Sequence, residues 1–115
     1  MADCVFCKIA SGEIPAKLVR RSDEALAFHD LTPQAPVHVL VITTKHYAAA
    51  RDATGREGEE VLGKLMAFAT QVATDLGLDA GGYRLVTNTG ADGGQSVFHL
   101  HLHLLGGRRM GWPPG

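Results

Sequence analysis

The chain has 115 residues, enough for one hydrophobic core but too few for two domains, so we expect a single domain over residues 1–115. Hydrophobic residues make up 45% of the chain and charged residues 20%, which is typical of a globular protein and argues against disorder. The net charge of -1, from 11 basic against 12 acidic residues, leaves no basic excess, so we expect no nucleic-acid or membrane partner.

The N-terminal segment carries both cysteines of the chain, Cys4 and Cys7, in a C-x-x-C spacing. This segment lacks the basic and long apolar regions of a secretory signal, and no apolar run reaches the ~20 residues needed to span a bilayer. We therefore expect a cytoplasmic protein whose cysteines stay reduced. The spacing fits a metal half-site, a redox pair or two small buried side chains.

The rest of the chain predicts short strands and one long helix. Thr54 and Glu57 have capping-box spacing at the start of this helix, apolar residues then recur at helical intervals, and Gly77 ends it. In chain order, the predicted elements are a helical turn at 5–10, strands at 18–20, 25–29 and 37–43, the long helix, and strands at 83–88 and 97–105. This pattern indicates an α+β fold with an antiparallel sheet, and so little helical cover favours dimerisation.

The last predicted strand alternates histidine with leucine. Side chains of a strand alternate between its two faces, so His99, His101 and His103 share one face while the leucines point into the core. Such a row could be an ordinary polar face or could bind a metal ion. Catalysis is the favoured interpretation, because imidazole titrates near neutrality and a row of imidazoles suits an extended anion such as a phosphate.

A glycine-rich loop at 90–94 precedes this strand. Glycines allow the backbone to approach a ligand and to turn its N–H groups toward an anion, and Ser96 adds a hydroxyl donor. A loop of this kind is usually only a turn. Directly before a row of histidines, it predicts a phosphate-binding segment.

At these residues the sequence resembles the histidine triad superfamily, in particular its Hint-type branch, the histidine triad nucleotide-binding proteins. The resemblance covers nearly the whole chain. The matching segments are 6–9, 12–17, 26–30, 33–38, 93–98, the histidine row, 105–108 and 112–115.

The resemblance implies a homodimer in which two five-stranded antiparallel sheets, each with one long helix and a short N-terminal helix, join into a ten-stranded sheet. Members bind purine nucleotides and hydrolyse nucleoside 5'-phosphoramidates, with no cofactor required for catalysis. By position in the motif, His101 would attack phosphorus and form a nucleotidyl-histidine that water cleaves. His103 and His38 would contact the phosphate, and His99 would orient or assist the leaving group.

The resemblance also implies a nucleotide-binding set. Asp30 would hold the ribose hydroxyls. An apolar base pocket would be formed by Phe6, Ile9, Ile14, Phe28 and Leu31, and the α-phosphate would be bound by Asn88, Gly94, Ser96 and the backbone near Val97. Without the resemblance, these residues are interpreted as core, turn and strand-end positions.

Some members of the superfamily hold a zinc ion, and the residues that match its ligands here are Cys4, Cys7, His46 and His99. Two thiolates and two imidazoles suit a tetrahedral structural site. The alternative is a pair of reduced, inert cysteines, as in members that lack this set. If His99 binds zinc, it cannot also donate a proton to the leaving group.

Two other functions remain open at this point. Another branch of the superfamily hydrolyses dinucleoside polyphosphates, and the protein could instead be a nucleotide-binding regulatory scaffold with incidental catalysis. In the Hint-type branch the C-terminal segment, here with Trp112, lies near the partner's active site and influences the leaving group. His29 receives no role.

Overall fold

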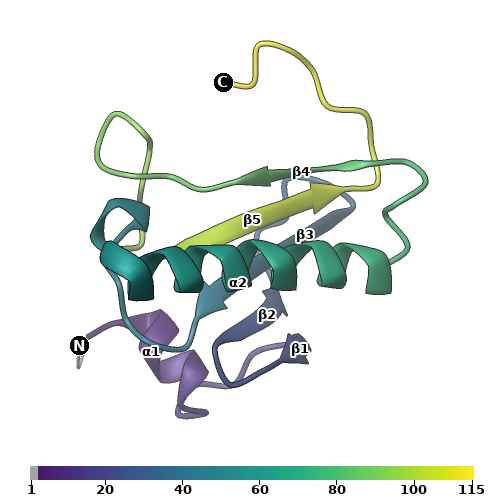
Figure 1. Ribbon diagram of the computed structural model, residues 1–115. Helices are drawn as coiled ribbons and strands as arrows, with labels where there is room; N and C mark the ends of the chain where they lie inside the picture. The colour runs from purple at the N-terminus through teal and green to yellow at the C-terminus, as the bar shows by residue number, and fades with distance from the viewer. Residues whose placement is uncertain (1–2) are drawn as a thin grey trace.

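The computed structural model describes residues 3–115, so the first two residues of the predicted domain lie outside the described part. A single five-stranded sheet has the order β1-β2-β3-β5-β4, and all neighbouring strands are antiparallel (Figure 1). The elements are α1 (Val5–Ala10), β1 (Leu18–Arg21), β2 (Ala25–His29), β3 (Val37–Thr43), the 3-10 turn η1 (Ala50–Asp52), α2 (Gly55–Asp75), β4 (Tyr83–Val86) and β5 (His101–Gly106). The predicted five-stranded antiparallel sheet with one long and one short helix is confirmed.

The two faces of the sheet are covered by different helices. On one face, Val39 and Val41 of β3 pack with Leu65 and Val72 of α2, which runs across the sheet in Figure 1. On the other face, residues of β2 and β3 pack with Phe6 of α1. The middle of β3 is therefore apolar at successive positions, because burial on both faces removes the usual alternation.

The long helix starts and ends where the sequence predicts, but its start differs in detail. Thr54 is the N-cap residue, yet its side chain makes no capping hydrogen bond. The Glu57 carboxylate instead accepts hydrogen bonds from Lys45 and Tyr47, so the predicted capping box does not form. Gly77 follows the C-cap with a φ of 74°. Within residues 3–115, no helix combines the length and the hydropathy needed to cross a membrane.

Two predicted strands are shorter than expected. The last was predicted over 97–105, but β5 begins at His101, because its partner β3 ends at Thr43 and the regular pairing stops at Ile42 opposite His101. The strand predicted over 83–88 ends at Val86. Beyond it, the Thr87 hydroxyl donates a hydrogen bond to the His101 carbonyl. His99 therefore precedes the strand, which changes its surroundings.

Candidate active site and metal centre

Three histidines meet on the sheet face that α1 covers. His101 and His103 lie on β5, and His38 lies near the start of β3. The ring centroids of His101 and His103 are 5.1 Å apart, and those of His38 and His103 are 5.2 Å apart. The antiparallel pairing of β3 with β5 thus places the predicted residue His38 beside the row, although it is 65 positions away from His103 in the sequence.

The hydrogen bonds of His101 fix which of its nitrogens carries the proton. Its Nδ1 lies 2.6 Å from the main-chain carbonyl oxygen of His99. A carbonyl oxygen can only accept, so Nδ1 carries the hydrogen and donates it. In the neutral ring, Nε2 then keeps its lone pair, which is the state that a nucleophile needs.

Two hydrogen bonds in series, a relay from Gln34 through His38, fix which nitrogen of His103 carries the proton. The backbone N–H of Gln34 donates to Nδ1 of His38 at 3.0 Å, so the proton of the neutral His38 ring is on Nε2. His38 Nε2 lies 2.9 Å from Nδ1 of His103, and donates to it. The His103 proton is consequently on Nε2, where it can be donated to a phosphate oxygen.

The same relay argues against a metal ion at the set formed by Asp30, His38 and His103, whose ligand atoms lie close together. The Asp30 carboxylate oxygen is 3.5 Å from His38 Nε2. An ion bound to that nitrogen would displace its proton, while Gln34 keeps the other nitrogen from carrying one. His38 would have to become an imidazolate, so this set is better suited to anion contacts.

Burial controls the charge of the row. Desolvation is the largest effect on each of His99, His101 and His103, and it lowers the pKa of all three imidazoles below the ordinary value of 6.5. The neighbouring imidazoles of His101 and His38 lower the pKa of His103 further. The three rings are therefore neutral at pH 7, which suits a nucleophile.

An apolar cavity of about 340 Å³ is lined by Phe6, whose ring centroid is 5.1 Å from that of His101. The structure brings the five residues of the predicted base pocket together around it, and Asp30 and Val97 also line it. Asp30 Oδ1 accepts hydrogen bonds from the backbone N–H of Thr32 at 2.7 Å and from its hydroxyl at 3.2 Å. Leu31 is 91% exposed at the rim. A second cavity of about 510 Å³ shares Asp30 and Leu31 with the apolar cavity and is also lined by His38, whereas a cavity of about 620 Å³ lies apart, near Arg108 and Arg109.

The glycine-rich loop is held by a residue that the sequence analysis did not select. Gln95 is buried, accepts a hydrogen bond from the Gly90 N–H, and donates to the carbonyl oxygens of Ala48 and Val97. Asn88 donates to the Gly93 carbonyl at 2.6 Å. A single glutamine in a polar loop gives no sequence signal, because its partners become visible only in the folded chain.

The phosphate-loop residues predicted from the resemblance lie on or beside this loop. Gly94 has a φ of 74°, a conformation that favours glycine, and a Cβ built on it would lie 3.9 Å from the Asn88 side-chain nitrogen. Ser96 is exposed, and Val97 is half-buried. His29, which received no role, is exposed at the end of β2 and also lines the apolar cavity.

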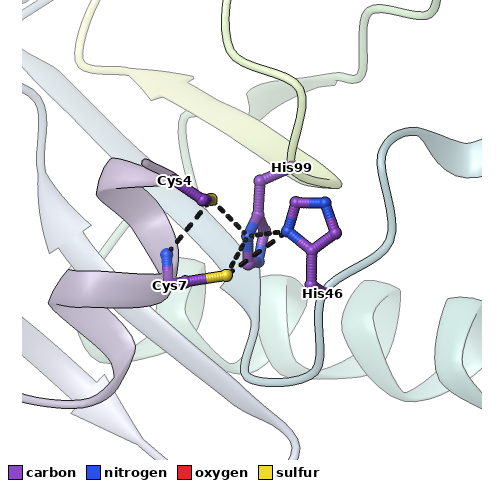
Figure 2. A group of neighbouring side chains, drawn as sticks. All are labelled: Cys4, Cys7, His46 and His99. Atoms are coloured by element: carbon purple, nitrogen blue, oxygen red, sulfur yellow. Dashed lines mark hydrogen bonds between the residues drawn. The ribbon is translucent and has the colours of Figure 1, made fainter. Parts of the chain in front are cut away.

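A second cluster joins the two cysteines to two histidines (Figure 2). Sγ of Cys4 and Sγ of Cys7 lie 3.3 and 3.5 Å from Nδ1 of His99, and Sγ of Cys7 lies 3.3 Å from Nδ1 of His46. The two imidazole nitrogens are 3.2 Å apart. All four predicted zinc-ligand residues thus direct a donor atom to one point, and these atoms lie within 4.8 Å of one another.

The surroundings of the cluster fit a zinc ion. His99 Nε2 lies 2.7 Å from the Thr43 carbonyl, so it carries the proton and leaves the lone pair of Nδ1 for a metal. Two thiolates and two imidazoles form a common tetrahedral zinc set. Burial and the neighbouring Cys4 thiol raise the pKa of Cys7, so without a cation its thiolate is disfavoured. A shared cation would explain why two cysteine sulfurs and two imidazole nitrogens lie this close together.

The position of His99 bears on its predicted role at the leaving group. Its side chain is fully buried, and both ring nitrogens are engaged, Nδ1 in the cysteine cluster and Nε2 with Thr43. The ring is therefore directed at the cluster. Its main-chain carbonyl is the group that contacts His101.

Comparison with known proteins agrees with this geometry. The HIT domain family matches residues 11–110. The structure resembles a HIT family hydrolase from Legionella pneumophila, with a TM-score of 0.93, 50% identity, and coverage of 98% of this chain and 100% of the other. A 14 kDa zinc-binding protein of Brassica juncea is 46% identical over 98% of this chain and 100% of its own length.

Another relative carries the name of an enzyme. Adenylylsulfatase HINT1 of Arabidopsis thaliana is 46% identical over 96% of this chain and 76% of its own length. With the histidine row, the fold and these matches in agreement, the chain belongs to the HIT domain family.

Proposed function

We propose that this protein is a hydrolase that binds purine nucleotides and cleaves the P–N bond of nucleoside 5'-phosphoramidates. The observation that carries the proposal is the hydrogen bond from His101 Nδ1 to the His99 carbonyl, which leaves Nε2 of a neutral imidazole as the nucleophile. An apolar cavity that could hold a purine base is lined by Phe6, whose ring contacts His101.

The nucleotide would be held by the residues that the structure brings around the cavity and the loop. The base would lie among Phe6, Ile9, Ile14, Phe28 and Leu31, and Asp30 would accept hydrogen bonds from the ribose hydroxyls. Asn88, Gly94, Ser96 and the backbone near Val97 would contact the α-phosphate. The phosphate contacts would thus come from polar side chains, backbone N–H groups and neutral imidazoles.

The reaction would proceed in two displacements. The Nε2 lone pair of His101 attacks the α-phosphorus, so a P–N bond to the histidine forms while the bond to the leaving amine breaks. The amine takes a proton from water as it leaves, or it leaves as the neutral amine if the substrate nitrogen is protonated before the P–N bond breaks, since both nitrogens of the His99 ring are engaged. Water then attacks phosphorus, the bond to His101 breaks, and the nucleoside monophosphate leaves.

His103 and His38 would stabilise charge on the phosphate. The relay from Gln34 through His38 leaves His103 with an N–H at Nε2. As negative charge grows on the phosphate oxygens in the transition state, this donor would strengthen its hydrogen bond. The role requires no titration of either histidine.

Cys4, Cys7, His46 and His99 would hold a structural zinc ion, which supplies a cross-link between segments. Support comes from their converging donor atoms and from the Brassica juncea relative, whose name describes a zinc-binding protein. Metal analysis of the purified protein tests this site. We expect about one equivalent of zinc per chain, and its absence would contradict the assignment.

The leaving group is tested with one enzyme preparation and three substrates. These are an adenosine 5'-phosphoramidate, adenylyl sulfate, suggested by the name of the Arabidopsis relative, and a diadenosine polyphosphate. We expect the highest kcat/KM for the phosphoramidate. A higher value for either of the other two substrates would contradict the proposed specificity.

The nucleophile is tested with His101→Asn, which keeps a polar side chain but has no imidazole lone pair. We expect turnover to fall by about 10³-fold or more, while AMP affinity stays close to that of the wild type. Wild-type reactions quenched in base, where the acid-labile P–N bond survives, should yield a protein with the nucleotide attached to His101. Retained activity in the variant would contradict the mechanism.

A homodimer with a ten-stranded sheet completes the proposal. β4 is an edge strand of the sheet, and Trp112 in the C-terminal segment is 84% exposed. An edge strand offers unpaired backbone groups to a second chain, and a large exposed indole is a ready anchor. Light scattering should give the mass of two chains, and a monomer at micromolar concentration would contradict this part of the proposal.

A further inference from the structure

His99 belongs to the cysteine cluster through its side chain and to the active site through its backbone. Its Nδ1 faces Cys4 and Cys7, whereas its carbonyl oxygen accepts the Nδ1 hydrogen of His101 at 2.6 Å. The residue is 0% exposed. A movement of the His99 ring would therefore also move the His99 carbonyl, which orients the His101 ring.

Phe6 provides a second connection between the two sites. It precedes Cys7 in α1 and is 6% exposed. Its ring lies edge-on to both His99 and His101, with centroid distances of 5.9 and 5.1 Å. The nucleophile is thus in contact with a ring that the cysteine-bearing helix carries.

The His99 carbonyl is not held by the regular ladder of the sheet. Regular pairing of β5 starts at His101; just before it, the Leu100 carbonyl accepts a hydrogen bond from the Thr43 N–H at 3.4 Å, and the Leu100 N–H donates to the Tyr47 carbonyl at 2.7 Å. Tyr47 follows His46, so the loop that carries one cluster residue also positions this stretch. The cluster therefore joins three segments, α1, the loop after β3, and the residues just before β5 (Figure 2).

We propose that zinc bound by Cys4, Cys7, His46 and His99 positions the catalytic nucleophile, with His99 as the positioning residue that links the ion to His101. Binding would fix the His99 peptide so that its carbonyl holds His101 in the form with a proton on Nδ1 and a lone pair on Nε2. Loss of the ion would let this carbonyl move and both forms of the neutral ring become populated.

This positioning role predicts a larger effect on rate than on nucleotide affinity. Phe6 and Ala10 pack α1 against Leu26, Phe28 and Ile42, and these apolar contacts do not need a bound ion. The apolar cavity therefore keeps its walls when the ion is removed. If the ion only cross-linked the segments, its removal would lower stability and leave the protonation form of the His101 ring unchanged.

The experiment compares zinc-loaded wild type, chelator-stripped wild type, stripped protein reloaded with zinc, and zinc-loaded His46→Gln. The first readout is the ¹⁵N NMR spectrum of the His101 ring at one alkaline pH, where every imidazole is neutral. We expect a single form with hydrogen on Nδ1 in the loaded protein, a mixture of both forms after stripping, recovery on reloading, and an intermediate spectrum for His46→Gln.

The second readout is single-turnover cleavage of an adenosine phosphoramidate, and this arm rests on the proposed function. Stripping should lower the rate at least about tenfold. The Kd for AMP should change less than about twofold. The matched control is zinc-loaded Val72→Ala, a core substitution in α2 that lowers stability at a residue belonging to neither site, and its His101 spectrum should equal that of the wild type.

Each contrary result has its own meaning. An unchanged His101 spectrum after stripping overturns the inference, as does a loss of AMP affinity equal to the loss of rate, or a protein that binds no zinc. If stripping unfolds the chain, the folded His46→Gln variant decides, and a wild-type spectrum there overturns the inference. If loaded wild type cleaves no phosphoramidate, the proposed function fails while the spectrum still tests the positioning of His101.

Discussion

Replacing Gln95 with alanine should loosen the glycine-rich loop and lower the stability of the protein. The Gln95 side chain is 9% exposed and makes three hydrogen bonds to backbone groups. Its oxygen accepts from the Gly90 N–H at 2.9 Å, and its nitrogen donates to the carbonyls of Ala48 at 2.7 Å and Val97 at 3.2 Å. The side chain therefore ties both ends of the loop to the segment after β3.

The expected loss follows from these three contacts. A hydrogen bond of this kind contributes ~0.5–1.5 kcal/mol net, so three together contribute roughly 1.5–4.5 kcal/mol. The contact with Val97 is the longest, and water can reach part of the loop once the side chain is removed, which places the expected value in the lower half of that range. The free energy of unfolding of Gln95→Ala should thus fall by about 2–3 kcal/mol. The KM for the phosphoramidate should rise more than kcat falls, because the loop would contact the substrate phosphate.

Urea unfolding of the wild type, Gln95→Ala and Gln71→Ala measures this effect. Gln71 is the matched control, because its exposed side chain makes a single contact, 3.4 Å from Asp75, on the surface of α2. Its replacement should change the free energy of unfolding by less than about 0.5 kcal/mol. If Gln95→Ala is as stable as Gln71→Ala, the loop is held by its own backbone and the reasoning is refuted.

Three further predictions concern charge and packing. Burial lowers the pKa of the imidazoles of His99, His101 and His103, so the unfolded chain binds more protons than the folded chain as the pH falls below about 6.5. The urea midpoint of unfolding should therefore decrease as the pH is lowered through this range. A midpoint that rises would contradict the assignment of neutral rings. A Cβ on Gly58 would lie 2.1 Å from the Ala53 carbonyl carbon, so Gly58→Ala should lower the free energy of unfolding by about 2 kcal/mol or more. A Cβ on Gly63 in the same helix meets open space, so Gly63→Ala should raise it by ~0.5–1 kcal/mol. Thermal unfolding of the two variants checks the difference. The ion pair between Arg20 and Asp75 is 2.6 Å long but about 40% exposed on both sides, so Arg20→Ala should leave the urea midpoint nearly unchanged, and a clear decrease would show a packing role for Arg20.

Local periodicity determined much of the fold. The alternation of histidine with leucine assigned His101 and His103 to one face of a strand because successive side chains of a strand point to opposite faces. Helical spacing and Gly77 likewise located α2 and its end. These features depend on residues within a few positions of one another, so they can be predicted directly from the sequence.

Contacts between distant segments decided the rest. The strand predicted at 97–105 was too long, because the number of paired residues depends on where β3 ends, and this placed His99 before the strand with its ring toward the cysteines. The proton positions on His38 and His101 depend on Gln34 and on a main-chain carbonyl, whose donor or acceptor character no residue pattern reveals. By itself, the sequence determined which side chains carry the proposed chemistry, whereas the tertiary structure decided which nitrogen of each imidazole carries the proton, because only folding brings its hydrogen-bond partner within reach.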